Sequence, residues 1–217
     1  MATTKKIFCI LILLLPVFLI TGPAIPDIII SLASIFLIIY IYFSKEKYNL
    51  VQHEWFKISI VFWLFLIFSS FFAYNLLKAF TDSLIFIRLL LIPALVFIIV
   101  FESQSTIKYL FVVIFSSVVF VIFDTFLQFL NYDSITGFGE DIFGYIPDNS
   151  PHSRLTGPFK DLVTGAYVSK FSFFGLMCIY LFIKNRFYQN LIIIIYLAFA
   201  GFVTFISGER MAFATFG

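Results

Sequence analysis

Seven long apolar runs decide which folds this sequence can form. They cover residues 7–22, 27–43, 58–73, 84–101, 109–130, 163–183 and 191–206. A helix rises 1.5 Å per residue, so about 20 residues cross the roughly 30 Å of hydrocarbon in a bilayer. The runs do not alternate apolar and polar residues, and open strands cannot satisfy their backbone groups in lipid. The sequence therefore predicts an all-α bundle of about seven membrane-spanning helices, with the start of an eighth before Gly217, in a single membrane domain covering residues 1–217.

The composition agrees with a membrane environment and excludes several other classes of protein. Hydrophobic residues make up 62% of the chain and charged residues only 12%, which is more apolar surface than one water-soluble core can bury. The net charge of +2 and the scattered basic residues exclude a nucleic-acid-binding face. Both cysteines, Cys9 and Cys178, lie inside apolar runs, so no disulfide framework or metal site is predicted. No cofactor is predicted either.

The first apolar run is open to two interpretations. Lys5 and Lys6, the apolar stretch and the small residues "GPA" at 22–24 are typical of a secretory signal with a cleavage site. A second run follows almost at once, after a segment that contains Pro23 and Pro26, and this favours an uncleaved helical hairpin. Both interpretations leave the orientation of the later runs the same.

The basic residues predict that the N-terminus lies in the cytoplasm. In this orientation, eight of the fourteen Lys and Arg residues fall in cytoplasmic segments, four fall in outer loops, and Arg88 and Lys170 fall inside spans. Cytoplasmic loops of membrane proteins carry an excess of Lys and Arg, so the opposite orientation is disfavoured. The eight cytoplasmic residues are Lys5, Lys6, Lys45, Lys47, Lys57, Lys108, Lys184 and Arg186.

This orientation places several charges on the outer side of the membrane. At 1.5 Å per residue, Arg88 lies about 6 Å below the outer boundary, and Asp124 and Lys170 lie about 10 Å below it. Arg210 follows the outward end of the seventh run, and Arg154 lies in the loop above. Intramembrane charges usually face a partner or a cavity, although long Lys and Arg side chains also snorkel to the headgroups. Asp124 is too short to snorkel, so we expect it to pair with Arg88 or Lys170, or to line a polar cavity.

The long hydrophilic segment at about residues 131–162 is predicted to be an outer loop. It is rich in Gly, Pro, Asn, Asp and Ser, so turns and irregular structure are expected. Its length is typical of a functional loop or a disordered one. Its aromatic residues favour packing at the membrane interface, namely Phe138, Phe143, Tyr145 and Phe159. Its acidic residues lack the spacing of a calcium-binding EF-hand, which favours a solvated acidic face made by Asp133, Glu140, Asp141 and Asp148.

Two short motifs in the second half of the chain resemble a known family. They are "RLTGPFKDLVTGAYVSKF" at 154–171 and, after one more span, "SGERMAF" at 207–213. This ordered pair is similar to the O-antigen ligase and O-antigen polymerase superfamily of bacterial envelope glycosyltransferases. Its members share an Arg-x-x-Gly-x-Phe loop before a glycine-containing span, and an Arg directly after a Ser-Gly or Thr-Gly pair. The resemblance covers about residues 120–217, and the first half matches only as a series of spans.

The resemblance implies a reaction and a site. Such enzymes transfer a glycan from a polyprenyl pyrophosphate to a glycan or lipid acceptor at the outer face of the bacterial inner membrane. Arg154 and Arg210 match the family's arginines, so they are expected to bind the pyrophosphate or the glycan, for which guanidinium offers a planar fork of donors that stays charged. Glu209 is expected to orient Arg210 or to contact sugar hydroxyls. Arg88 and Lys170 are further candidate substrate-binding residues.

Other interpretations of the same residues are open. "SGER" is also consistent with a plain turn in which Glu209 and Arg210 are solvated. A flippase or another transporter would also carry intramembrane charges, with Pro16 and Pro93 marking broken helices. Members of the resembled family continue with further spans and a loop that carries a histidine, so we expect this chain to be the N-terminal part of a longer protein, or an inactive fragment. The catalytic base is then not assigned, and His152 is interpreted as an ordinary loop residue.

Overall fold

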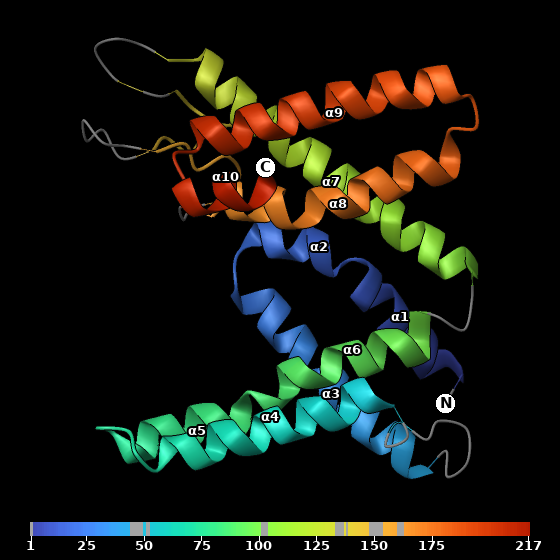
Figure 1. Cartoon of the computed structure of the whole chain (residues 1–217), viewed down its shortest axis with the longest axis vertical. Coiled ribbons are helices and arrows are strands. Elements are labelled where there is room, and N and C mark those ends of the chain that lie inside the picture. Colours follow the sequence, from blue (N-terminus) through green and yellow to red (C-terminus); the bar gives the residue numbers. More distant parts are fainter. Residues whose placement is uncertain are drawn as a thin grey trace. The chain divides into compact units, whose positions relative to one another are not determined.

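The computed structural model describes residues 2–43, 50, 53–100, 104–132, 137, 139–147, 154–159 and 163–217. Within these ranges the chain is helical and forms no β-strand, which confirms the all-α prediction (Figure 1). The elements are α1 (Ala2–Leu13), α2 (Leu15–Phe18), the 3₁₀ helix η1 (Leu19–Thr21), α3 (Ala24–Phe43), α4 (Glu54–Ser70), α5 (Leu76–Ile85), α6 (Ile87–Val100), α7 (Gln104–Leu130), α8 (Thr164–Phe182), α9 (Arg186–Ile206) and α10 (Arg210–Phe216).

The helices form two compact units. Unit 1 contains Met1–Ile12 and Ala24–Thr106, and unit 2 contains Leu13–Pro23 and Ile107–Gly217. Unit 2 therefore combines α2 and η1 with the four helices α7 to α10, and unit 1 contains α3 to α6 together with most of α1.

Five helical segments among the described residues are long and apolar enough to cross a membrane. They are Ala24–Tyr42, Leu76–Ile98, Ser105–Leu130, Thr164–Phe182 and Arg186–Ile206. They support a multi-pass membrane protein, whereas seven spans are not confirmed. The first predicted span is interrupted, because α1 ends at Leu13 and α2 begins at Leu15. Pro16 lies in the first turn of α2, and because proline has no backbone N–H, it cannot continue the hydrogen bonds of the preceding helix. The third predicted span forms α4, a helix of 17 residues.

The fourth predicted span begins earlier than its hydropathy indicates. α5 starts at Leu76 rather than near residue 84, because the Asn75 side chain accepts a hydrogen bond from Lys78 N at 3.2 Å and caps the helix. Phe86 alone separates α5 from α6. Arg88 is therefore twelve residues from the start of this span, which is about 18 Å along the axis rather than about 6 Å.

Unit 1 contains a polar link between α3 and α6. Arg88 Nη2 lies 2.9 Å from Asp27 Oδ2, and Arg88 Nη1 donates to Ser31 Oγ at 2.9 Å. The Ser34 hydroxyl donates to the Arg88 carbonyl at 3.0 Å. Arg88 is thus paired with Asp27 inside unit 1, whereas the sequence predicted Asp124 as its partner.

In unit 2 the helices α7, α8 and α9 enclose one apolar core. Helices α8 and α9 approach closely because Gly175 leaves room for Tyr196, and a Cβ atom at Gly175 would collide with the Tyr196 ring. Helix α7 packs through larger aromatic side chains, with the rings of Phe115 and Tyr196 5.5 Å apart and those of Phe126 and Phe199 5.8 Å apart. The centre of the core is fully buried and contains Val118, Val121, Val168, Ala200 and Val203.

One end of unit 2 collects the polar side chains, and we call it the polar end. It comprises the last turns of α7 from Asp124 onward, residues 139–147 and 154–159, the first turn of α8, and the turn 207–210 between α9 and α10. Figure 1 shows α10 lying beside both α8 and α9 at this end, and contacts between these helices agree with the view.

Candidate functional site

Gln128 on α7 organises the polar end. Its side chain is fully buried, and its Oε1 atom accepts hydrogen bonds from Thr156 N at 3.1 Å and Gly157 N at 2.9 Å. Its Nε2 atom donates to Tyr145 O and to Thr156 Oγ1, each at 3.4 Å. One amide therefore holds both described parts of the long loop against α7.

The glycine and phenylalanine of the Arg-x-x-Gly-x-Phe motif have structural roles. Gly157 has φ +54°, a left-handed conformation that favours glycine, and a Cβ atom there would collide with Thr125 Oγ1. Phe159 is buried, and its ring lies 5.2 Å from that of Tyr167 on α8. Packing and backbone conformation therefore explain these two positions without a ligand.

The "SGER" turn is fixed to the start of α8. Ser207 is buried and donates to Thr204 O at 2.8 Å, and Gly208 has φ +72°. Glu209 Oε1 accepts from Gly165 N at 2.7 Å, and its Oε2 accepts from Ala166 N at 3.0 Å. These N–H groups belong to the first turn of α8, where helix donors lack backbone partners and a carboxylate is favourable. Glu209 is thus a helix cap that joins α9, α10 and α8.

Arg154 and Arg210 both belong to the polar end. The Arg154 stem packs over Gly208, because its Cγ atom lies only 3.3 Å from a Cβ position built there. Arg210 follows two residues later, a stretch of chain that spans at most about 7 Å. Both side chains are exposed. Among the residues that the structure describes, neither guanidinium has an ion-pair or hydrogen-bond partner.

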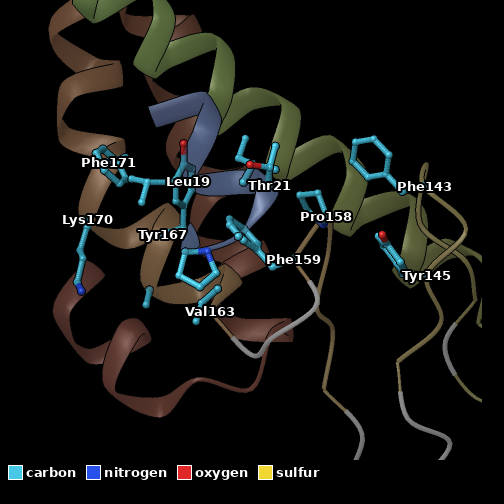
Figure 2. Close-up of a pocket in the computed structure, with 14 residues that line it drawn as sticks. Leu19, Thr21, Phe143, Tyr145, Pro158, Phe159, Val163, Tyr167, Lys170 and Phe171 are labelled. Atoms are coloured by element: carbon cyan, nitrogen blue, oxygen red, sulfur yellow. The ribbon is translucent and has the colours of Figure 1, made fainter. Parts of the chain in front are cut away.

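A pocket of about 740 Å³ lies in unit 2 beside the polar end (Figure 2). Aromatic side chains from residues 143–145, from Phe159 and from α8 form much of its wall. Leu19 and Thr21 of η1 form another side. The Tyr167 hydroxyl on α8 donates to Pro16 O at 2.8 Å and so joins α8 to α2, the helix directly before η1. Lys170 is the one charged residue among the described residues of the lining, and Figure 2 shows its side chain extending away from the Phe171 ring.

Two acidic residues of the polar end differ from their predicted roles. Asp124 is fully buried and accepts a hydrogen bond from Ile142 N at 2.7 Å, and no ion pair joins it to Lys170 in the described part of the chain. Asp141 is only 7% exposed, and its Oδ1 atom accepts from Phe143 N and Tyr145 N. A solvated acidic face is therefore wrong at Asp141, because the turn needs this carboxylate as an internal acceptor, whereas Glu140 is exposed as predicted.

The structure brings together most, but not all, of the predicted site residues. Arg154, Glu209 and Arg210 meet at the polar end, with Asp124 and Lys170 in the same unit, whereas Arg88 belongs to unit 1. His152, Asp133 and Asp148 lie outside the described residues. Within the described ranges no group of three or more His, Cys, Asp or Glu side chains gathers to hold a metal ion.

Comparison with known proteins gives no relative from which to assign a role. No family model matches the sequence, and no curated protein and no solved structure is similar to the chain at a significant level.

Proposed function

We propose that this protein is a membrane glycosyltransferase of the O-antigen ligase or O-antigen polymerase type, which transfers a glycan from a polyprenyl diphosphate donor. The observation that carries the proposal is that the guanidinium groups of Arg154 and Arg210 have no partner among the described residues. In the two motifs, Gly157, Phe159 and Glu209 have packing or capping roles, and the Arg154 stem packs over Gly208, but neither guanidinium group has such a role.

Two like charges at one end of a unit favour an anionic ligand, because an anion that lies between two cations is attracted to both. A diphosphate offers oxygens in the arrangement that guanidinium binds with paired, charge-assisted hydrogen bonds. The Arg154 stem packs over Gly208, and the Glu209 cap directly precedes Arg210, so the backbone close to both arginines is held in place.

The pocket supports a donor with an apolar chain. Its volume of about 740 Å³ lies within the range of roughly 300–1,000 Å³ that is usual for ligand sites. Its aromatic and aliphatic wall suits an isoprenoid chain, and Lys170 adds one cation to the pocket that an anionic headgroup can approach.

The arginines would act on the leaving group. In glycan transfer, an acceptor hydroxyl oxygen bonds to the anomeric carbon of the donor sugar, and the bond from that carbon to the diphosphate oxygen breaks. The polyprenyl diphosphate leaves with the bonding electrons, so its negative charge grows, and fixed cations beside it lower the barrier. The acceptor hydroxyl loses its proton in the same step, and we assign no residue of this chain as the base.

We also propose that the polar end faces the periplasm of a bacterial inner membrane and that the N-terminus is cytoplasmic. The excess of basic residues in the segments that would face the cytoplasm supports this orientation. A reporter fused after residue 187 should be active in the cytoplasm, and one fused near residue 145 should be active in the periplasm. The reverse pattern would overturn the proposed location of the site.

Substitution of Arg210 tests the proposed role in transfer. Arg210→Ala in the intact protein should lower polysaccharide formation by about 10²-fold or more, the usual cost of losing a group that stabilises developing charge. Arg210→Lys should restore little activity, because an ammonium keeps the charge and loses the planar fork. Arg186→Ala is the matched control, because Arg186 is an exposed arginine at the opposite end of α9.

Two readouts separate the possible results. Product is measured by gel analysis of the polysaccharide, and protein level is measured by immunoblot of the membrane fraction. Normal polysaccharide with Arg210→Ala would exclude the proposed role. Loss of both protein and product would instead support a purely structural turn.

A transfer assay in detergent separates the enzyme from a transporter. A transferase should form the new glycosidic bond when the purified protein, the donor and the acceptor are mixed in micelles. A flippase has no second compartment in micelles and forms no product there, so an inactive but folded protein would count against the proposal.

A further inference from the structure

Two buried carboxylates at the polar end each have one oxygen without a partner. Asp124 on α7 is fully buried, and Asp141 in the loop is 7% exposed. The Oδ1 atom of Asp124 accepts from Ile142 N, and that of Asp141 accepts from Phe143 N and Tyr145 N, at 2.7–2.8 Å. The Oδ2 atoms of both residues are buried and have no hydrogen-bond partner in the described structure.

These two carboxylates are close neighbours. Asp124 accepts its hydrogen bond from the N–H group of Ile142, the residue directly after Asp141. The Asp141 side chain accepts from the N–H groups of the same turn, at Phe143 and Tyr145. A formal charge of −2 is therefore concentrated between the end of α7 and the turn at 141–145.

No basic side chain compensates this charge in the described part of unit 2. The ion pairs found among the described residues, Lys57 with Glu54 and Arg88 with Asp27, both belong to unit 1. Arg154, Lys170 and Arg210 are exposed. Buried carboxylates in proteins are normally paired, bound to a metal ion or neutralised by a proton, because an isolated buried charge is strongly unfavourable.

We propose that Asp124 and Asp141 bind one hard divalent cation, Ca²⁺ or Mg²⁺, through their Oδ2 atoms. Protonation of both carboxyl groups would also remove the charge, but it would leave at least one buried O–H group without an acceptor among the described residues, whereas a divalent cation neutralises both carboxylates and binds both Oδ2 atoms. Carboxylate oxygens select hard cations over zinc or copper, and such ions complete their coordination with backbone carbonyls and water.

The cation would fix one wall of the pocket. Asp141 holds the turn that carries Phe143 and Tyr145, and both of these residues line the pocket. Linking Asp141 to Asp124 through a metal ion joins this turn to α7. The inference rests on the two carboxylates alone and does not require glycan transfer.

Cation binding is tested with the intact protein purified in lipid nanodiscs. After treatment with EDTA, Ca²⁺ or Mg²⁺ should raise the midpoint of thermal unfolding by at least about 2–4 °C, the shift that 1 kcal/mol produces in a chain of this size. KCl at equal ionic strength should not reproduce the shift. Mass spectrometry of the protein before EDTA treatment should find close to one divalent ion per chain.

Variants of the two carboxylates show whether the ion binds at this site. Asp124→Asn and Asp141→Asn keep the shape of the side chain and remove one negative charge, so each should abolish the cation-dependent shift. Asp82→Asn, at an exposed carboxylate on α5, is the matched control and should keep the shift. A wild-type protein that is insensitive to both cations would overturn the proposal. So would a shift that persists in either of the two Asn variants.

Discussion

Arg88 in unit 1 and the arginine pair in unit 2 show two different ways in which a membrane protein carries charge. The Arg88 guanidinium is held by Asp27 and Ser31 on a neighbouring helix. Arg154 and Arg210 lie together with no partner among the described residues. Folding alone accounts for the first arrangement, because the charge is compensated within the unit. In the second arrangement the charges are exposed to solvent and are not compensated by a described side chain. The absence of a protein partner, rather than the presence of a charge in an apolar chain, therefore marks a candidate anion site.

The adjacent residues Glu209 and Arg210 repeat this contrast. Both carboxylate oxygens of Glu209 accept backbone hydrogen bonds at the start of α8. Arg210 is exposed at the first position of α10. Of the two opposite charges in this turn, the acid therefore caps a helix, and the base has no partner among the described residues.

The largest effect on stability is expected at Gln128. Gln128→Leu leaves the N–H groups of Thr156 and Gly157 buried without their acceptor, at about 1–3 kcal/mol for each group. The free energy of unfolding should therefore fall by about 2–6 kcal/mol. Gln189→Leu is the matched control, because Gln189 makes one exposed hydrogen bond at 3.3 Å and should change stability little. Equal unfolding midpoints for the two variants in thermal melts would contradict the role of Gln128.

A smaller effect is expected at Glu209. Glu209→Gln keeps the size of the side chain but retains only one oxygen, so one of the two cap hydrogen bonds is lost. Loss of a helix cap costs about 1 kcal/mol, which thermal unfolding can measure. Because the cap also positions Arg210, the affinity for the diphosphate donor should weaken in the same variant. An unchanged donor affinity alongside reduced stability would show that Glu209 does not position the arginine.

The smallest effects on stability are expected for two substitutions that compare the partnered Arg88 with Arg210. Arg88→Met should lower the free energy of unfolding, and a double-mutant cycle with Asp27→Asn should give a coupling of about 0.5–1 kcal/mol, as for partly exposed ion pairs. Arg210→Met should leave stability unchanged or raise it slightly, because it removes repulsion from Arg154. A loss of stability with Arg210→Met that matches the loss with Arg88→Met would remove the distinction between partnered and unpartnered charges.

The sequence predicted the coarse architecture well, because the architecture depends on the average hydrophobicity of long segments. Long apolar runs identify helices in a membrane, and the all-α fold followed from them. Helix ends were less predictable, because they depend on single interactions. The cap at Asn75 extends α5 into a polar segment, and Pro16 divides the first apolar run.

The candidate site was predictable where a motif carries it and not where distant residues meet. Arg154, Glu209 and Arg210 stand in recognisable motifs, and the geometry places them together. Gln128, Asp141 and Asp27 were not predicted in their roles, because their partners are remote or cannot be read from residue type. Gln128 accepts hydrogen bonds from residues that follow it by 28 and 29 positions in the chain. Arg88 donates to Asp27, which precedes it by 61 positions. A single sequence contains no local signal for such contacts.

The most direct test of this account is the affinity of the purified intact protein for a polyprenyl diphosphate. Binding can be measured in nanodiscs for the wild type and for Arg154→Ala, Arg210→Ala and Arg88→Ala. We predict that each of the first two variants binds about tenfold more weakly or worse, a loss of about 1.4 kcal/mol, and that Arg88→Ala binds like the wild type. Equal affinities for all four proteins, or a loss confined to Arg88→Ala, would contradict the claim that the unpartnered arginines form the anion site.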